Sequence, residues 1–568
     1  MPSIGTESAP KHLRGDLRVI LGLTVLIFAP SIFTGVFADD YFHRLILSGQ
    51  LDAYGVAVNP FLDLFSFIPA DGPPRDLLTR RGFEPWWLAS DVYVQFFRPI
   101  TAVTHIIDYT VWPNVPALHH IHSLLWMCLL VWTLKRLYLA TGMSGLSLGL
   151  GLFFFAVDDA HMISVAWLAN RNVIIAGVFS ALAIESYVKW INGEVSIVRS
   201  LFWLTMAALS AEAGYCAIGY MVAWSLVYCS SWKARLTSPI PAALILVLVR
   251  ASTHILGYGT NGLSLYTDPL NDPLTFFVDA LARFPVLIGG LWLQFPTELS
   301  ALASPAQLMM VSAIIAVLLV PILHSFFVYS LVHKQTRFWL LGTVLSCLPL
   351  LAAIPMNRLL LIPSIGFCAA LAQYLTSRPT PWRHWLYTLH GPVAIGLCLV
   401  SYPLIYTLSE QTQAAHAFEG SKSGSGVSIY INGSAFHNGI HILADLEEKT
   451  RSDQQHVFLS HLFRRQTIVR RGPRTIEVSN SNGWFQSTIE RAFYDRHNPF
   501  TVGDRLPNSV FTARIMAVTE DGRPSAVQFT FKHSLESERY QWVCFTNAEF
   551  KQCTPPKLGE ILILDGLL

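Results

Sequence analysis

The sequence predicts a polytopic α-helical membrane protein that carries a small, mostly-β domain at its C-terminus. Hydrophobic residues make up 52% of the 568 residues and charged residues only 13%, and the mean hydropathy is +0.43. Apolar runs recur from Val19 to about Leu408, and about 20 such residues cross a bilayer. Beyond the last of these runs, apolar residues alternate with polar ones, which is typical of strands.

The apolar runs predict about eleven membrane-crossing helices within residues 1–410. When these helices alternate in direction, the tight basic clusters between them, such as Lys135-Arg136, all fall on the side of the N-terminus. Because Lys and Arg favour the cytoplasmic side, we expect a cytoplasmic N-terminus and an extracytoplasmic C-terminal domain. The first run lacks a small-residue cleavage site and is interpreted as a retained anchor. The predicted spans are residues 18–37, 118–138, 143–157, 171–190, 200–212, 213–230, 239–256, 306–331, 338–354, 357–376 and 386–407.

Two segments do not fit one simple span each. Residues 200–230 are too long for a single untilted crossing and carry Glu212 midway, so we expect two helices that meet there. Residues 276–297 are apolar but hold Asp279 and Arg283 on one helical face, and are interpreted as a helix at the membrane interface. If residues 200–230 formed one crossing and residues 276–297 another, the number of crossings would still be odd.

Three regions on the side opposite the N-terminus are large enough for chemistry. We call them the first loop (38–117), the second loop (158–170) and the third loop (257–305). The loops on the other side are all short. Function is therefore expected at the extracytoplasmic end of the helices.

The C-terminal part reads as a separate domain of residues 427–568 that follows a Gly/Ser-rich flexible linker, residues 411–426. Hairpins are predicted around Arg471–Arg474 and around Glu520–Arg523, and residues 441–450 look helical. Cys544 and Cys553 can form one disulfide at most. The formal net charge of +2 gives no reason to expect a nucleic-acid partner.

Two adjacent carboxylates, Asp39 and Asp40, follow the first apolar run directly. Carboxylates at the rim of a membrane can hold a metal ion beside a lipid phosphate, or take a proton from an incoming hydroxyl group. The alternative is the solvated start of a loop.

The second loop begins with another acidic pair. Asp158, Asp159 and His161 are followed by Arg171, all within fourteen residues. Carboxylates and a neutral imidazole suit a divalent cation such as Mg²⁺ or Mn²⁺, and an arginine at a helix start can meet a phosphate. The alternative is a helix N-cap with a snorkelling arginine.

Together, the two acidic pairs resemble the GT-C superfamily of integral-membrane glycosyltransferases, which take sugars from polyprenyl-phosphate carriers. The likeness is closer to the transmembrane-and-TPR O-mannosyltransferases and their bacterial relatives, and covers roughly residues 18–376. The matching segments, in chain order, are Phe97-Arg98-Pro99-Ile100, Asp108-Tyr109, His119–His122, Val165-Ala166-Trp167 with Arg171, Ser210-Ala211-Glu212, and Arg358 with Ile362–Phe367.

The resemblance implies transfer of a sugar to a glycan, lipid or protein acceptor at the outer face of a bacterial inner membrane. Asp39 or Asp40 would be the base, and a second carboxylate from Asp158, Asp159 or Glu212 would orient the acceptor or a metal. The implied metal ligands are Asp40, Asp159 and His161. The implied lipid-phosphate ligands are Arg98, Arg171 and Arg358.

The chain also departs from the family. Only the final His of the family's His-Pro-x-His remains, as His161; no Lys precedes Glu212; and the β domain replaces the TPR array. The sugar and the acceptor therefore stay open. The alternatives are a transporter or flippase for a lipid-linked glycan, and a non-catalytic scaffold for envelope glycan assembly.

Three further features have two interpretations each. The three histidines of His119–His122 suit helix capping better than metal binding. Trp86 and Trp87 are either a sugar platform or an interfacial aromatic belt. The arginines at 464, 465, 470, 471 and 474 are either a solvated hairpin or a contact with anionic lipid or glycan.

Overall fold

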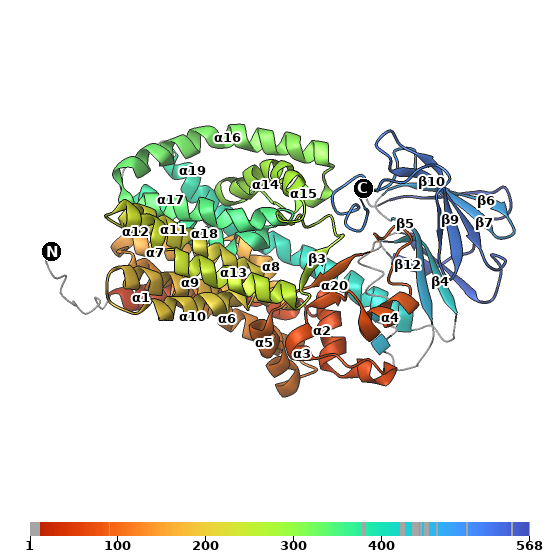
Figure 1. Cartoon of the computed structure of the whole chain (residues 1–568), viewed down its shortest axis with the longest axis horizontal. Coiled ribbons are helices and arrows are strands. Elements are labelled where there is room, and N and C mark those ends of the chain that lie inside the picture. The colour runs from red at the N-terminus through yellow and green to blue at the C-terminus, as the bar shows by residue number, and fades with distance from the viewer. Residues whose placement is uncertain are drawn as a thin grey trace.

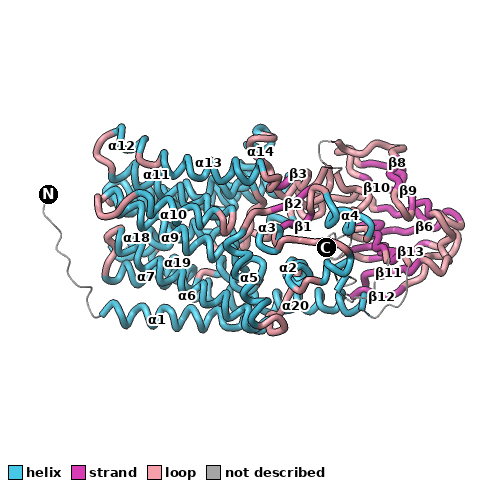
Figure 2. Tube along the Cα trace, turned by 60° about the horizontal axis from the view of Figure 1, so that its bottom comes forward, coloured by secondary structure: helices cyan, strands magenta, loops and turns pink. Residues whose placement is uncertain are grey.

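The computed structural model describes residues 12–89, 91–377, 382–420, 426–433, 442–443, 446–447, 454–461, 464–495, 498–546 and 549–566, with side chains left out for 12–16 and 414–420. Helices fill one end of the molecule and strands fill the other (Figures 1 and 2). Most of the predicted helix 441–450 lies outside the described residues.

The helical part is a bundle built around α9 and α18. Within their most apolar windows, 78% and 89% of the residues are buried in the protein, against 17% for α12–α13 and 28% for α16. Figure 1 accordingly shows α9 and α18 inside the bundle and α16 along its edge. The helices are α1 (His12–Phe28), α6 (Pro116–Ala140), α7 (Gly145–Val157), α8 (Met162–Ala166), α9 (Arg171–Ile191), α10 (Ile197–Ala208), α11 (Ala217–Tyr228), α12 (Trp232–Thr237), α13 (Ile240–Ile255), α14 (Pro273–Leu293), α15 (Leu299–Leu302), α16 (Pro305–Val332), α17 (Lys334–Cys347), α18 (Leu361–Ser377), α19 (Arg383–Thr388) and α20 (Ala394–Gly420).

Small residues let the central helices approach closely, as in other membrane bundles. A Cβ on Gly219 of α11 would lie 2.5 Å from the backbone of Ser346 in α17. A Cβ on Gly366 of α18 would lie 2.6 Å from Tyr220, whose hydroxyl donates to the carbonyls of Ile362 and Pro363 at 2.9 Å each. A glycine is therefore required at both contacts.

Seven helical segments of the described chain are long and apolar enough to cross a membrane, and the bent pair α7–α8 would be an eighth. The predicted count of eleven is not confirmed. Five of the predicted spans form helices of only 12 to 17 residues, namely α1, α7, α10, α11 and α17. The predicted break at Glu212 is confirmed, because α10 and α11 are separate helices.

The interpretation of residues 276–297 as a helix at the membrane interface, rather than a crossing, stays a prediction. α14 is one of the seven segments. Its two charged residues compensate each other, since Arg283 binds Asp279 at 2.8 Å and also donates to the carbonyl of Leu351 at 2.8 Å. A neutralised pair on one helical face does not exclude a crossing.

The first loop is folded rather than extended. It contains α2 (Asp39–Leu47), α3 (Pro60–Asp63), α4 (Gly72–Arg80), α5 (Pro99–Val111) and two short strands, β1 (Ser66–Ile68) and β2 (Tyr93–Gln95). Strand β3 (Gly259–Asn261) of the third loop pairs with β2, so the two loops share one antiparallel sheet.

The C-terminal domain packs two sheets around one core. The six-stranded sheet is antiparallel, in the order β13-β6-β7-β10-β9-β8. In the four-stranded sheet, of order β12-β11-β4-β5, β4 runs parallel to both neighbours. Both predicted hairpins, β6–β7 and β9–β10, are confirmed. The strands are β4 (Val427–Gly433), β5 (Gln455–His461), β6 (Gln466–Gly472), β7 (Thr475–Ser479), β8 (Arg505–Pro507), β9 (Phe511–Val518), β10 (Pro524–Phe531), β11 (Tyr540–Thr546), β12 (Glu549–Gln552) and β13 (Ile561–Leu564).

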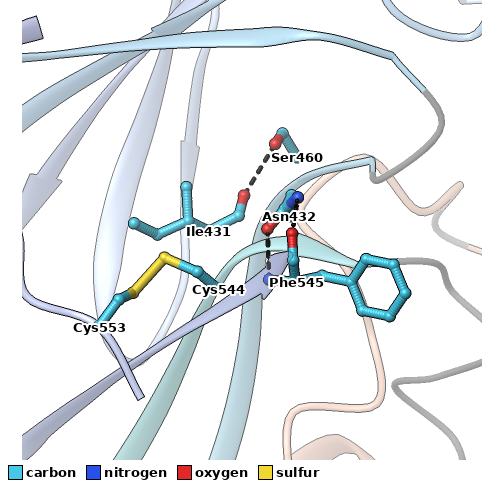
Figure 3. The surroundings of a disulfide bond; sticks show 6 residues. All are labelled: Ile431, Asn432, Ser460, Cys544, Phe545 and Cys553. Atoms are coloured by element: carbon cyan, nitrogen blue, oxygen red, sulfur yellow. Dashed lines mark hydrogen bonds between the residues drawn. A yellow bond between two sulfur atoms is a disulfide. The ribbon is translucent and has the colours of Figure 1, made fainter. Parts of the chain in front are cut away.

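Cys544 and Cys553, the one pair that the sequence allowed in this domain, form a disulfide that joins β11 to the residue after β12 (Figure 3). Beside it, the Asn432 side chain bonds to both the N–H and the carbonyl of Phe545 (2.9 and 3.1 Å). The helix α20 runs on to Gly420, so the first ten residues of the predicted linker are helical. Residues 421–425 of the linker lie outside the described part.

Trp86 and Trp87 of the first loop are neither a sugar platform nor a membrane belt. Both are buried in the core of the β domain, where the Trp86 ring lies 5.6 Å from Trp484 and its Nε1 donates to the carbonyl of Leu459 at 3.1 Å. Just before them, Gly82 (φ +84°) lies so close to His456 that a Cβ would sit 2.1 Å from its carbonyl oxygen. The first loop is therefore part of the β domain's core.

This docking yields a first prediction. Replacing Trp86 by Ala should lower the free energy of unfolding of the β domain by about 3–5 kcal/mol, because a large buried ring is removed. Thermal unfolding of the purified full-length protein in detergent measures the change. Trp232→Ala, at a tryptophan that is 66% exposed, is the matched control and should have little effect. Equal effects of both substitutions would contradict the docking.

Candidate functional site

The three loops meet at the end of the helical part that faces the β domain, which we call the loop end. Asp40, the second residue of α2, is buried there. Its carboxylate accepts hydrogen bonds from the backbone N–H groups of Phe37 (3.2 Å) and Ala169 (2.7 Å). Because Ala169 belongs to the second loop, Asp40 ties the first loop to the second. Both of its oxygens are used in this structural role.

Asp39 differs from its neighbour. It is half-buried, and no group in the described residues hydrogen-bonds to its carboxylate. Burial raises the pKa of Asp39 to about 6, although the nearby guanidiniums of Arg358 and Arg98 lower it in part. The preceding residue, Ala38, has a φ of +50°, a strained conformation for a residue with a Cβ. Asp39 is therefore the carboxylate of this pair that is available for chemistry.

Arg358 supplies a positive charge near Asp39 and makes no hydrogen bond among the described residues. It lies in the short 3₁₀ segment before α18, with its guanidinium 5.2 Å from the centre of the Trp167 ring. Its Nε is buried without a hydrogen-bond partner in the described residues. An arginine held over an aromatic ring with free donors is well suited to bind a phosphate.

Arg98 is close to the same carboxylate but is already paired. Its guanidinium binds Glu212 at 2.5 and 2.9 Å and stacks on Phe96 at 4.2 Å. Glu212, predicted as a catalytic acid, is therefore the charge partner of Arg98, with its side chain 48% exposed. Arg98 contributes positive potential near Asp39, while its donors toward Glu212 are occupied.

The acidic pair of the second loop lies at the bend between α7 and α8. The side chain of Asp158 accepts from the N–H of Ala160 at 3.0 Å, so this residue caps the following turn. In Asp159, one oxygen accepts from the Asn357 side chain at 3.4 Å, and the other is buried with no hydrogen-bond partner in the part of the chain that the structure describes.

Asn357 links this pair to an acid that the sequence analysis did not single out. The N–H of Asn357 donates to Glu298 of the third loop at 2.8 Å. Burial raises the pKa of Glu298, and adjacent Arg358 opposes that rise. In the sequence, Glu298 could be recognised only as an acid at the edge of an apolar segment in a long loop. Its partner, Asn357, lies 59 residues further along the chain.

The predicted metal ligands do not converge. The Asp40 oxygens accept two backbone N–H groups, and His161 is buried with its Nε2 2.9 Å from the Ser364 hydroxyl. Among the described residues, no three His, Cys, Asp or Glu side chains are grouped so that they could hold a metal ion. The set of Asp40, Asp159 and His161 therefore does not fit a divalent cation.

Arg171, predicted to bind phosphate, is instead bonded inside the bundle. Each of its three nitrogens donates a hydrogen bond: to Asp108 at 2.5 Å, to the Ser123 hydroxyl at 2.8 Å and to the carbonyl of His119 at 2.7 Å. Asp108 also accepts from His122 at 2.6 Å. The side chain is fully buried, so this guanidinium is not placed to meet a ligand at the loop end.

The histidines of His119–His122 diverge, as expected for neighbours on one helix. The Nε2 of His119 lies 3.1 Å from the carbonyl of Trp112, that of His120 lies 2.7 Å from the carbonyl of Gly35, and His122 binds Asp108. All three contribute to packing around α6. They do not form a metal site.

The β domain also holds the helix that carries Asp39. Arg44, near the end of α2, forms an ion pair with Glu447, and the hydroxyl of Tyr54 donates to the carbonyl of Leu446 at 3.2 Å. Leu443 and Leu446 join the apolar cluster beneath α2, which includes Tyr41 and Leu45. A residue 403 positions further along the chain therefore helps to fix the helix that carries Asp39.

Comparison with protein-family models and with curated proteins finds no match. Among solved structures, the chain is similar to the archaeal oligosaccharyltransferase AglB from Archaeoglobus fulgidus in complex with an inhibitory peptide and a dolichol-phosphate (10% identity, TM-score 0.40). That match covers 78% of this chain and 64% of the archaeal chain. The same archaeal enzyme tethered to an acceptor peptide gives 11% identity and a TM-score of 0.39, covering 79% and 64%. Neither similarity assigns a role to a residue.

The different environments of Asp39 and Asp40 yield a second prediction. Asp40→Ala should destabilise the protein by about 1–3 kcal/mol for each buried amide left without its acceptor. Asp39→Ala removes no hydrogen bond and should leave the stability nearly unchanged. Thermal unfolding of both variants in one detergent checks the contrast. A larger loss for Asp39→Ala would refute the assignment of Asp40 as the structural member of the pair.

Proposed function

We propose that the protein is a membrane glycosyltransferase that transfers a sugar from a polyprenyl-phosphate-linked donor to an acceptor. The observation that carries this proposal is that a carboxylate, Asp39, and a guanidinium near it, Arg358, make no hydrogen bond among the described residues where the three loops meet. Such a site provides a base beside an anion-binding group.

In the proposed reaction, an acceptor hydroxyl attacks the anomeric carbon while Asp39 takes its proton. The new bond joins the acceptor oxygen to that carbon. The bond from the carbon to the phosphate oxygen breaks, and its electron pair leaves with the lipid phosphate. Arg358 offsets the charge that grows on this phosphate, and the positive potential of Arg98 adds to the effect. Attack opposite the leaving group inverts the anomeric centre.

Asp159 and Glu298 are proposed to orient the acceptor. Both carboxylates bond to Asn357, the residue directly before Arg358. Glu298 also interacts electrostatically with Arg358, so this carboxylate lies near the guanidinium at which the phosphate would bind. We assign no step to a metal ion, because the predicted ligand set does not converge. Arg171 is no phosphate ligand in this proposal, because its guanidinium is bonded to Asp108, Ser123 and His119.

We further propose that the loop end faces away from the cytoplasm, in a bacterial inner membrane with about eleven crossings and a periplasmic β domain. The basic clusters between the predicted spans support this orientation. The Cys544–Cys553 disulfide supports it independently, because disulfides persist in oxidising compartments.

The role of Asp39 yields a third prediction. Asp39→Asn should lower the rate of sugar transfer from a polyprenyl-phosphate donor about 10²–10⁴-fold, the usual cost of losing a general base. Because a base acts as its carboxylate, the wild-type rate should rise with pH through the Asp39 pKa of about 6 and then level off. Radiolabelled donor and purified protein in lipid measure both effects.

Asp52→Asn is the matched control, since Asp52 is an exposed acid of the same loop. It should leave the rate and the pH profile unchanged. Normal transfer by Asp39→Asn would eliminate the catalytic assignment.

Arg358 yields a fourth prediction. Arg358→Ala should weaken binding of the donor lipid about 10- to 100-fold, the effect of losing one or two charge-assisted hydrogen bonds. Arg358→Lys should restore binding only in part, because a point charge lacks the planar fork of a guanidinium. Titration of the protein in nanodiscs with a donor analogue measures the affinities. Arg235→Ala, on α12 at the far end of the bundle (Figure 1), is the control. Unchanged affinity for Arg358→Ala would refute the phosphate site.

A further inference from the structure

A polar hollow lies on the β domain, at the ends of β6, β7 and β10 that are remote from the Arg471–Arg474 turn. Its volume is about 530 Å³, and every residue that lines it is polar. None of these residues is acidic. They are Arg464, Arg465, Thr467, Ser479, Asn480, Ser481, Asn482, Gln486 and Ser525.

Two of the five arginines near this hairpin face the hollow, and the other three are bonded elsewhere. Arg470 forms an ion pair with Glu536, Arg471 binds Glu477 at 2.9 Å, and Arg474 donates to the carbonyl of Lys532 at 3.4 Å. The arginine cluster noted in the sequence therefore divides into three arginines near the turn that are bonded to other groups of the domain, and two arginines that line the hollow.

Neither of the two arginines at the hollow hydrogen-bonds to an acid among the described residues. Arg465 is 68% exposed, and its nearest acid, Asp565, is itself 88% exposed at 3.5 Å. The Nε of Arg464 lies 3.4 Å from the buried carboxylate of Glu490 without a hydrogen bond. Their outer nitrogens are therefore available to a carboxylate or phosphate, which a guanidinium binds through two parallel bonds.

Neutral donors and acceptors surround this pair. In the described residues, the hydroxyls of Thr467, Ser481 and Ser525 and the side-chain amide of Asn482 make no hydrogen bond within the protein. Hydroxyls and amides both donate and accept, so they match the hydroxyls of a sugar ring. No aromatic ring lines the hollow, so binding by stacking on a neutral sugar has no support there.

We propose that this hollow is a binding site for an acidic glycan, a saccharide chain whose rings carry carboxylate or phosphate groups. The arginines bind the anionic groups, and the hydroxyl and amide side chains bind the ring hydroxyls. The loop after β7 supplies four of the lining residues. It also reaches the third loop, where the N–H of Thr488 donates to the carbonyl of Ala303 and that of Ile489 to the carbonyl of Ala301 (3.0 and 2.9 Å). A glycan bound here lies beside the junction of the β domain with the helical part. The proposal does not depend on the transfer reaction.

The test measures binding by the full-length protein in phosphatidylcholine nanodiscs, without donor lipid. The probes are hexagalacturonate, a phosphomannan hexamer and neutral maltohexaose. At least one acidic hexamer should bind, more tightly at low salt, and maltohexaose should not. Arg465→Ala should weaken binding about tenfold or more, and Asn482→Ala should weaken it less. Arg474→Ala, which removes an exposed guanidinium from the same hairpin, should leave binding unchanged.

Several results would overturn the proposal. They are absence of binding by both acidic hexamers, equal binding of maltohexaose, and equal loss in Arg465→Ala and Arg474→Ala. Binding of inorganic phosphate as tight as that of the hexamers would reduce the hollow to a simple anion site. Arg465-dependent binding to phosphatidylglycerol vesicles without glycan binding would assign it to lipid instead. Because Arg465 is exposed, Arg465→Ala is expected to fold, and its thermal unfolding verifies this.

Discussion

The position of the first loop between the helices and the β domain is the constraint on which the rest of the structure depends. At one end of the loop, Asp40 accepts hydrogen bonds from the backbone N–H groups of Phe37, just before the loop, and of Ala169 in the second loop. Farther along, Trp86 and Trp87 enter the β-domain core. Burying two such rings contributes several kcal/mol, more than a surface ion pair, so they dominate the docking. The helix that carries Asp39 is consequently fixed from both sides.

The arginines show how similar residues acquire different roles. A buried guanidinium without partners would cost several kcal/mol, so Arg171 is stable inside the bundle only because Asp108, Ser123 and His119 accept its hydrogen bonds. Arg358 stands at the loop end over Trp167, where part of its charge can reach solvent or a ligand. Environment, rather than residue type, therefore separates a structural guanidinium from one that can bind phosphate.

The β domain packs against the helical part of the protein. It contributes Glu447 to the ion pair with Arg44 on α2, and Leu443 and Leu446 to the apolar cluster beneath that helix. The loop after β7 also bonds to the third loop. These contacts give the domain a structural role at the loop end, since the carboxylate of Asp39 is positioned by a helix that the domain helps to hold.

The sequence by itself determined the elements whose signals are local. Hydropathy gave most of the long helices, period-two alternation gave both hairpins, and Glu212 marked the break between α10 and α11. The sequence motifs also singled out Asp39 and Arg358 as candidate site residues. Only the tertiary structure decided which partners these residues have. Asp40 and Asp39 are adjacent with the same side chain, yet one is bonded to Ala169, 129 residues away, and the other is not. Trp86, Arg171 and Glu298 likewise acquire their environments from distant segments. Hydrogen bonding and burial depend on which segments meet in space, and neither hydropathy nor spacing along the chain contains that information.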